Sequence, residues 1–325
     1  DYSTGAEAFL LEPQSVNLFQ YSNNFSVSNW VKQTGIIPTY NTTETLSPDG
    51  TYNATKLVGN GNAGIYGQIT NLSGVVSRSV YLKSVTGTTT ARFRDPNTSA
   101  ISPISLTITN EWQRFEMIGD NGSSIQGLWI DDITSDGLYI YGAQLEQANS
   151  VGYSGEYATS YIPTSGTTVT RNQELCYDAT PVINSEEGVL YAEISALVDD
   201  APHRWISLSD ATTNNRVNFQ YYTGSNEIRV EVRSEGVTSL NSFIIVTDIT
   251  DFIKIGVKWK LNDFAVWING VEVATSNTGN APIGMSTLSF THYGQSANPF
   301  FGNTKGLKVY PKALSDVELQ DLTTI

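Results

Sequence analysis

A stretch of alternating charged and aliphatic residues, EIRVEVRS at positions 227–234, is the first pattern in the chain that could do chemistry. Successive side chains of a β-strand point to opposite faces, so the aliphatic residues would face a core. Arg229, Glu231 and Arg233 would then line the other face. Guanidinium groups donate hydrogen bonds in a rigid fork that fits carboxylates and hydroxyl groups. The pattern predicts a face that could hold the polar groups of a sugar.

A second pattern, KWKLNDFAVW at positions 258–267, predicts a hairpin that turns on Asn262-Asp263. A two-residue turn there pairs Lys258 with Trp267 on the face away from the core. If this hairpin shares a sheet with the arginine strand, Trp267 would be an aromatic plate among charged donors, an arrangement that suits a sugar ring. The alternative is a solvated face with one cation–π contact.

Five further residues are candidate ligand contacts because of the loops around them. In the second half, Arg204, His292 and Tyr293 could form another set at the rim of a sandwich. In the first half, Tyr66 and Trp129 lie in or beside Gly/Asn-rich loops, where a ring could stack on a sugar. The alternatives are ordinary surface residues and half-buried rings.

Known catalytic patterns are missing from the sequence. Only two histidines occur, His203 and His292, and no G-x-S-x-G elbow accompanies them. Glu227 and Glu231 lack the central Asp that concanavalin-like glycosidases place between two carboxylates on one strand. His203 and the segment QYYTG supply residue types that polysaccharide lyases use, without a recognisable pattern. We therefore expect a non-catalytic protein, with a lyase or glycosidase as the alternative.

Composition predicts an all-β protein. Of the 325 residues only 15% are charged, and the net charge is −14, which disfavours broad attraction to nucleic acid or anionic membranes. The single cysteine, Cys176, excludes an intrachain disulfide. No apolar run approaches the ~18 residues that a membrane span requires.

Short apolar segments recur at roughly ten-residue spacing with Gly, Asn and Asp between them, which is typical of antiparallel sandwiches and jelly rolls. A seam at 138–171 separates two such series, because the strand LYIYGAQLE gives way there to the linker-like IPTSG. We predict two antiparallel β-sandwich (jelly-roll) domains in tandem, at residues 1–170 and 171–325.

One short C-terminal helix completes the predicted fold. Ser315 and Glu318 have the spacing of a capping box, which marks the start of a helix. Leu314, Val317 and Leu322 are its expected apolar side.

Six segments carry a family resemblance in the first half: FLLEPQSVNLFQYSNNF, SPDGTYNATKLV, SVYLKS, TNEWQRFEM, LYIYGAQLEQ and ATSYIPTSGTTVTR. Together they resemble the carbohydrate-binding-module-like jelly roll of bacteriophage tail and virion proteins. The resemblance covers nearly all of residues 1–172. It implies a non-catalytic domain on a phage structural protein, and it implies that the opening DYSTG continues from an upstream region, which could carry catalysis.

The segments FIKIGVKWKLNDFAVWINGVEVATS and GNTKGLKVYPKALSDVELQDLTT resemble a laminin-G-like, concanavalin A-like sandwich over residues 185–325. That fold hosts lectins, glycosidases, lyases and adhesion modules, so it does not decide the function.

The first resemblance also implies a metal site. Jelly rolls of this type often hold a structural Ca²⁺ where their first and last strands meet, which makes Glu12 and Glu146 candidate ligands. Asp131 and Asp132 offer a second possibility. The alternative is solvated carboxylates.

Together the resemblances imply a carbohydrate-binding or adhesion part of a phage tail or virion surface protein, located on the virion or otherwise extracellular. A host or environmental polysaccharide or cell-surface glycan and other virion proteins are the expected partners. Besides the enzyme alternative, a purely structural fibre module that forms a homotrimer would also fit.

Overall fold

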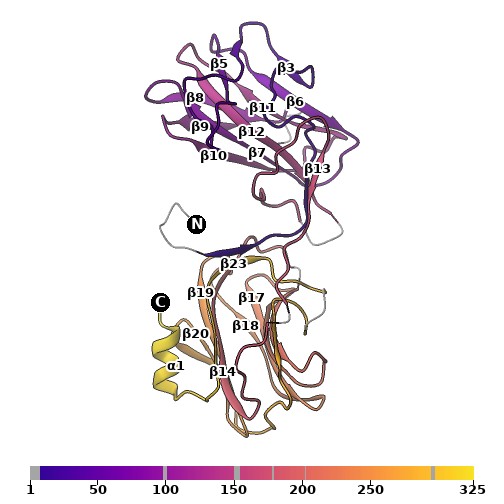
Figure 1. The fold of residues 1–325 in the computed structure, drawn as a ribbon, viewed down its shortest axis with the longest axis vertical. Helices are drawn as coiled ribbons and strands as arrows, with labels where there is room; N and C mark the ends of the chain where they lie inside the picture. The colour runs from indigo at the N-terminus through magenta and orange to yellow at the C-terminus, as the bar shows by residue number, and fades with distance from the viewer. Residues whose placement is uncertain (1–7, 98–100, 150–153, 178, 202, 294–296) are drawn as a thin grey trace. The chain divides into compact units, whose positions relative to one another are not determined.

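The computed structural model describes the chain outside residues 1–7, 98–100, 150–153, 178, 202 and 294–296. It divides into two compact units (Figure 1). We call Pro13–Asn172 the first sandwich, and Gln173–Ile325 with the segment ending at Glu12 the second sandwich. The structure confirms the predicted fold class, because antiparallel strands form both units and one short helix follows near the C-terminus. No helix in the described part of the chain is long and apolar enough to cross a membrane.

Two five-stranded antiparallel sheets form the described part of the first sandwich, beside a short two-stranded pair. One sheet has the order β10-β7-β12-β5-β4, with the bounds Gln113–Gly119, Val76–Ser84, Leu138–Gln147, Thr55–Val58 and Ile37–Thr39. The other has the order β3-β6-β11-β8-β9, with the bounds Trp30–Lys32, Ile65–Thr70, Ile125–Asp131, Thr89–Arg94 and Ile104–Ile108. The pair joins β2 (Ser15–Asn17) to β13 (Val169–Arg171). Alternating apolar side chains from both large sheets form one buried core.

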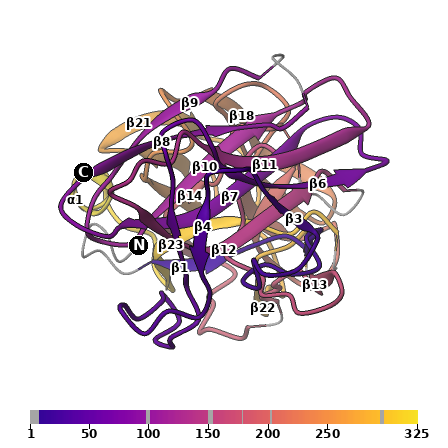
Figure 2. The same cartoon turned by 90° about the horizontal axis from the view of Figure 1, so that it is seen from above.

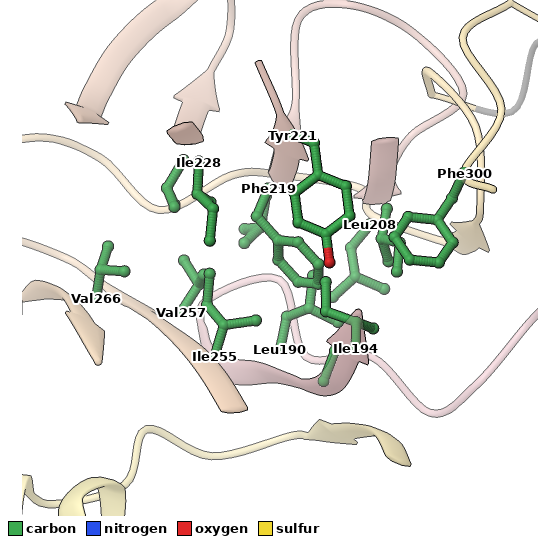
Figure 3. Packing of buried hydrophobic residues seen from close by; sticks show 14 of the residues in the cluster. Leu190, Ile194, Leu208, Phe219, Tyr221, Ile228, Ile255, Val257, Val266 and Phe300 are labelled. Atoms are coloured by element: carbon green, nitrogen blue, oxygen red, sulfur yellow. The ribbon is translucent and has the colours of Figure 1, made fainter. Parts of the chain in front are cut away.

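A six-stranded and a five-stranded antiparallel sheet form the described part of the second sandwich. The six-stranded sheet runs β1-β23-β14-β19-β20-β21, with the bounds Phe9–Leu11, Gly302–Tyr310, Glu187–Ala196, Ile253–Lys260, Phe264–Ile268 and Val271–Ser276. The five-stranded sheet runs β18-β17-β16-β15-β22, with the bounds Val237–Ile245, Glu227–Ser234, Arg216–Tyr221, Arg204–Ser209 and Thr287–Ser289. Their inner faces share a core in which Phe219 and Ile228 of one sheet face Leu190 and Val257 of the other (Figure 3).

The N-terminal strand belongs to the second sandwich, not the first as predicted. β1 pairs with β23, placing Leu10 opposite Asn303, and the labels of the two strands lie together in Figure 2. Leu11 is buried in the second core. The first sandwich is thus inserted between β1 and β14, and its boundary follows Asn172 instead of residue 170. Strands that are neighbours in the sequence usually pair, so the spacing of the strands could not reveal that β1 pairs with β23 near the other end of the chain.

The C-terminal helix α1, Asp316–Thr323, begins with the predicted capping box. The Ser315 hydroxyl accepts a hydrogen bond from the Glu318 N–H, and the Glu318 carboxylate accepts one from the Ser315 N–H at 2.8 Å. The predicted apolar side is correct in part: Leu314 packs against the cluster around Leu319 and Leu322 is half-buried, but Val317 is 68% exposed, and the buried residues of the helix are Leu319 and Thr323. These two side chains face β19 at Gly256, where a Cβ atom would lie 3.3 Å from Thr323 Cγ2.

Helix α1 covers the outer face of the six-stranded sheet at β19, β20 and β21 (Figure 1). Figure 2 again places it beside β21. Leu319 forms a small cluster there with Val189, Ala265 and Trp267. This face of the sheet is therefore an interior surface, where we had predicted a solvent-facing one.

Candidate functional site

The outward side chains of β16 and β17 form one polar surface, which we call the arginine face. Inward residues of both strands are aliphatic or aromatic and lie in the core. The cross-strand register places Arg216 opposite Arg233, Asn218 opposite Glu231, and Gln220 opposite Arg229. The arginine face thus comprises Arg216, Asn218, Gln220, Arg229, Glu231 and Arg233.

Glu231 lies at the centre of the arginine face and is 4% exposed. Its Oε2 accepts a hydrogen bond from Arg216 Nη2 at 2.6 Å. Its Oε1 lies 3.5 Å from Arg229 Nη2 and 3.8 Å from Arg233 Nε. Three guanidinium groups against one carboxylate leave a local excess of positive charge on a chain whose net charge is −14. Such a face favours an anionic group.

Several buried polar atoms of this face find no hydrogen-bond partner among the described residues. Both the Oδ1 and the Nδ2 atoms of Asn218, which is fully buried, are without a partner. The same holds for Gln220 Nε2, for Arg216 Nε and for Trp205 Nε1. Unpaired buried polar atoms are costly to a folded protein and are concentrated at functional sites. Because Asn218 and Gln220 are 0% and 1% exposed, these atoms lie below the surface of the arginine face.

Aromatic side chains from β15 and the segment after β22 border the arginine face. The rings of Trp205 and His292 have centroids 3.9 Å apart, and those of His292 and Tyr293 are 3.6 Å apart. The Arg216 guanidinium lies 5.8 Å from the ring centroids of both Trp205 and Tyr293. Burial, reinforced by the positive charge of Arg216, lowers the pKa of His292 to about 4. The imidazole is therefore neutral at pH 7.

On the other side the arginine face continues into two aromatic rings, the half-buried Tyr222 and the exposed Phe243. The guanidinium of Arg229 lies 5.6 Å from the Tyr222 ring centroid and 5.5 Å from that of Phe243. Phe243 is 51% exposed, and its ring contacts Tyr222 edge-on at 5.3 Å. His203 contacts Tyr222 at 4.7 Å and shares a hydrogen bond with Gln220 Oε1 at 3.0 Å. An open ring face thus adjoins charged and polar donors.

The structure brings together five of the residues that the sequence singled out: Arg229, Glu231, Arg233, His292 and Tyr293. Three residues of this surface are not predicted from the sequence, Arg216, Asn218 and Trp205, and Gln220 enters only through the segment QYYTG as a residue type that lyases use. The signal was present, because RVNFQYY alternates polar and apolar residues as EIRVEVRS does. Reading the two strands as neighbours would have put Asn218 beside Glu231.

The predicted partnership of Trp267 and Lys258 with these arginines is wrong. β19 and β20 belong to the six-stranded sheet, whereas β17 belongs to the opposite one. Trp267 is 8% exposed, because helix α1 packs over it, and it cannot offer a ring face to a sugar. Lys258 forms ion pairs with Asp263 at 2.8 Å and Asp316 at 3.4 Å.

Arg204 also lies away from the arginine face. It shares the inward side of β15 with Ile206 and Leu208, and it is 2% exposed. Its guanidinium pairs with Asp200 and donates to the Val198 carbonyl at 3.1 Å. Arg204 therefore has a structural role at the end of the strand.

Tyr66 and Trp129 of the first sandwich are cross-strand neighbours on β6 and β11. Their ring centroids are 5.5 Å apart, and the Arg94 guanidinium lies 4.1 Å from the Trp129 ring. Both rings are half-buried. Arg94 also pairs with Asp131 at 3.1 Å. Arg94 stacks on Trp129, and neither ring of this row is as exposed as Phe243 of the second sandwich, at 51%.

The two candidate calcium ligands fall in different sandwiches, and a calcium site that uses both stays a prediction. Glu12 lies in the second sandwich, where its N–H donates to Glu174 Oε2 at 2.9 Å. Glu146 is fully buried in the first sandwich and accepts hydrogen bonds from the hydroxyls of Ser15 and Ser77 and from the N–H and hydroxyl of Thr159. These donors satisfy the carboxylate and tie β2, β7 and β12 together.

Asp131 and Asp132, the second possible metal ligands, pair with arginines instead. Arg92 lies 3.2 Å from the Asp131 carboxylate and 2.7 Å from that of Asp132. Within the described residues no group of three or more His, Cys, Asp or Glu side chains is arranged to hold a metal ion. A structural Ca²⁺ stays a prediction of the resemblance.

No protein-family model matches the sequence, and no curated protein matches it significantly. Solved structures similar to the chain include the CBM40 module of the Ruminococcus gnavus IT-sialidase bound to α2,3-sialyllactose, with a TM-score of 0.37 and 17% identity over 43% of this chain and 84% of that one.

Two further similar structures are a pentraxin of Limulus polyphemus and domains LG4-5 of the mouse laminin α1 chain. The pentraxin has a TM-score of 0.35 and 15% identity, covering 44% of this chain and 72% of its own. The laminin domains have a TM-score of 0.32 and 6% identity, covering 88% and 92%. These values assign neither a family nor a function, so the function has to be inferred from the site.

Proposed function

We propose that the chain binds carbohydrate and that its arginine face takes an acidic saccharide. The observation that carries the proposal is the cluster of Arg216, Arg229 and Arg233 around the single carboxylate of Glu231. Glu231 neutralises only one of the three guanidinium charges. The carboxylate of a uronate or a sialic acid would neutralise a second.

The surroundings of the cluster suit the rest of a sugar. Arg229 and Arg233 are the partly exposed donors of the face and can reach hydroxyl groups of a bound sugar. Asn218 and Gln220 are 0% and 1% exposed, so they lie beneath these donors and out of a sugar's direct reach. Phe243, which is 51% exposed, offers a ring face beside Arg229 on which the C–H face of a sugar could stack, and the half-buried Tyr222 adjoins it. Charge and aromatic surface thus occur together where both are needed.

The test compares acidic oligosaccharides with neutral ones of the same skeleton. Oligogalacturonates and alginate oligosaccharides are titrated into the protein by calorimetry, beside the same compounds with their carboxyl groups reduced to alcohols. We expect binding of at least one acidic compound, weakening as salt is added, and much weaker binding of its reduced form. Arg229→Ala should lower the affinity by about 10- to 100-fold.

Arg92→Ala is the matched control, because Arg92 is a partly exposed, ion-paired arginine of the first sandwich. It should leave the affinity unchanged. Equal binding of the acidic and reduced compounds, no binding of either, or an affinity that survives the double change Arg229→Ala and Arg233→Ala would contradict the proposal.

A polysaccharide lyase is the second candidate, because a neutral imidazole lies beside an arginine and a tyrosine. In β-elimination a base removes the proton on the carbon next to the uronate carboxylate, a double bond forms, and the leaving glycosidic oxygen takes a proton. His292 and Tyr293 have the chemistry for the two proton transfers, and Arg216 for holding the carboxylate. Ultraviolet absorbance of unsaturated uronates, lost in His292→Ala, would establish this activity.

The wider setting follows from the sequence resemblance alone. We propose a place on a phage tail or other extracellular surface, with other virion proteins as partners, and a homotrimer as one arrangement. A passive fibre module is the remaining alternative, and saturable binding of a saccharide would exclude it.

A further inference from the structure

The first sandwich contains an open cavity of about 790 Å³. It is lined by Tyr141 of β12, the residue after which the regular pairing of β12 with β7 is interrupted. We call it the tyrosine cavity. The volume falls within the range of small-molecule sites. Tyr141 and Tyr161 supply its aromatic wall, and Asn23, Asn41, Asp49 and Asn53 supply most of its polar wall.

The aromatic wall is held in place by contacts behind it. The rings of Tyr141 and Tyr161 meet edge-on with centroids 5.4 Å apart, and both pack against Tyr81. The Tyr161 hydroxyl shares a 2.6 Å hydrogen bond with Ser22 Oγ, which also accepts from the Thr164 N–H at 2.9 Å. Burial raises the pKa of Tyr141 to about 12, so its hydroxyl keeps its proton. The rings form a fixed surface.

The polar wall is fixed as well. Asp49 accepts hydrogen bonds from the Thr51 N–H and from Asn53 Nδ2, each at 2.9 Å. The Asn23 Oδ1 atom accepts the Gly142 N–H at 2.7 Å. Gly142 has φ +63°, a left-handed conformation at the point where the pairing of β12 with β7 shifts register. This bend in β12 adjoins Tyr141 at the cavity wall.

The charge of the tyrosine cavity differs from that of the arginine face. Its lining residues include one carboxylate, four asparagines and hydroxyl groups, but neither lysine nor arginine. Burial raises the pKa of Asp49, but hydrogen bonds from Thr51, Asn53 and Tyr141 outweigh that effect and keep the pKa below its ordinary value. An ionised carboxylate repels acidic ligands and accepts hydrogen bonds from hydroxyls.

We propose that the tyrosine cavity is a second saccharide site, specific for neutral sugars: hydroxyls would donate to Asp49 and bond the asparagine amides, while a sugar ring lies against Tyr161. This site is independent of the arginine face, because it lies in the other sandwich and favours the opposite charge. Four of the segments that distinguish the first half, SNN, SPDGTYN, LYIYG and SYIPTS, converge on its wall.

The test uses the full chain and neutral oligosaccharides of glucose, mannose, galactose and N-acetylglucosamine, none with a carboxylate or sulfate, titrated by calorimetry. We expect saturable binding of at least one of them. Tyr161→Ala should weaken it by about 10- to 100-fold, and Asp49→Asn by about tenfold, because a charge-assisted hydrogen bond becomes a neutral one. Tyr161→Phe separates loss of the hydroxyl from loss of the ring.

Two matched controls lie in the same sandwich. Tyr52→Ala removes an exposed tyrosine of the loop that holds Asp49, and Asp136→Asn removes an exposed carboxylate outside the cavity. Both should bind as the parent does, and thermal melts should show that all variants fold. Failure of every neutral probe to bind, or binding unchanged in both Tyr161→Ala and Asp49→Asn, overturns the proposal.

A cross-test separates this proposal from that for the arginine face. Arg229→Ala should leave neutral saccharide binding intact, and Tyr161→Ala should leave acidic saccharide binding intact. Loss of neutral binding in Arg229→Ala alone would place that binding at the arginine face and would overturn the second site without affecting the first.

Discussion

A buried arginine–carboxylate pair in the first sandwich, Arg78 with Asp95, can be compared with one in the second, Arg216 with Glu231, and the two pairs differ in how completely they are hydrogen-bonded. In the first sandwich Arg78 and Asp95 are both fully buried and lie 2.8 Å apart. In the second, Arg216 and Glu231 are 5% and 4% exposed and lie 2.6 Å apart. The Arg78 guanidinium makes five hydrogen bonds, to Gly127, Val76, Gly119, Asp95 and Gln126.

Arg216 makes far fewer contacts. It donates to the Thr213 carbonyl at 2.8 Å and to Glu231, whereas its Nε finds no partner among the described residues. Its neighbour Asn218 is likewise unpaired.

The surroundings of the two carboxylates also differ: in the described part of the chain Asp95 pairs with Arg78 alone, whereas Glu231 is shared by Arg216, Arg229 and Arg233. A carboxylate shared by three guanidinium groups leaves positive charge that an anionic ligand can neutralise.

The largest effect is expected at the structural pair. Asp95→Ala leaves the Arg78 charge buried without its carboxylate and removes acceptors for Asn121 and for the Gly127 N–H. We expect the first sandwich to lose about 3–5 kcal/mol of its free energy of unfolding. Urea unfolding should show a lower midpoint concentration for this sandwich, and calorimetric melts a lower melting temperature. Both quantities should stay unchanged for the second sandwich. A loss below about 1 kcal/mol would contradict a structural role for the pair.

A smaller effect, of a different kind, is expected at the arginine face. Glu231→Gln keeps the shape of the side chain but removes the one negative charge among three guanidinium groups. Because Glu231 competes with the carboxylate of a ligand, we expect the affinity for an acidic oligosaccharide to rise by about three- to tenfold. Calorimetric titration measures this change.

Asp95→Asn is the matched control for Glu231→Gln, since it neutralises the carboxylate of the other buried pair and should not tighten binding. Weaker binding in Glu231→Gln would mean that Glu231 itself contacts the sugar, and the arginine face would then be specific for a neutral ligand.

Much of the fold could be predicted from alternation, because side-chain parity depends only on local sequence. Ile255, Val257 and Trp259 lie in the core as predicted. The register was wrong: Lys258 pairs with Ala265 instead of Trp267, because the turn is made by Leu261-Asn262, with Asn262 at φ +57°. A shift of two residues leaves every side chain on its predicted face, so the error did not affect the core.

The site was less predictable, because it depends on which sheets and helices lie side by side. Alternation placed Trp267 on the outer face, and this is correct, but the local sequence could not show that helix α1 covers it. Arg229, Glu231 and Arg233 were recognised because one strand carries all three. Arg216 and Asn218 needed the pairing of β16 with β17, which is non-local information.

The last effect, a dependence of stability on pH, is expected from the histidine beside the arginine face, and it follows from a pKa. Folding lowers the pKa of His292 from its ordinary 6.5 to about 4, chiefly by burial and then by the positive charge of Arg216. His203 and Arg229 lower it a little further, whereas the carboxylate of Glu231 acts in the opposite direction. Above pH 6.5 the imidazole is neutral in both states. As the pH falls from about 6.5 to about 4, the unfolded chain binds a proton that the folded chain does not, so stability declines.

Comparing the parent with His292→Gln isolates this contribution, because the carboxylates of both sandwiches titrate equally in the two proteins. Urea unfolding at pH 7 and at pH 5 should show a larger loss of stability for the parent. Both histidines of the chain lie in the second sandwich, so only its transition should differ between the two proteins. The same loss in parent and variant would mean that water reaches His292, and Arg216 would then be less enclosed than its 5% exposure indicates.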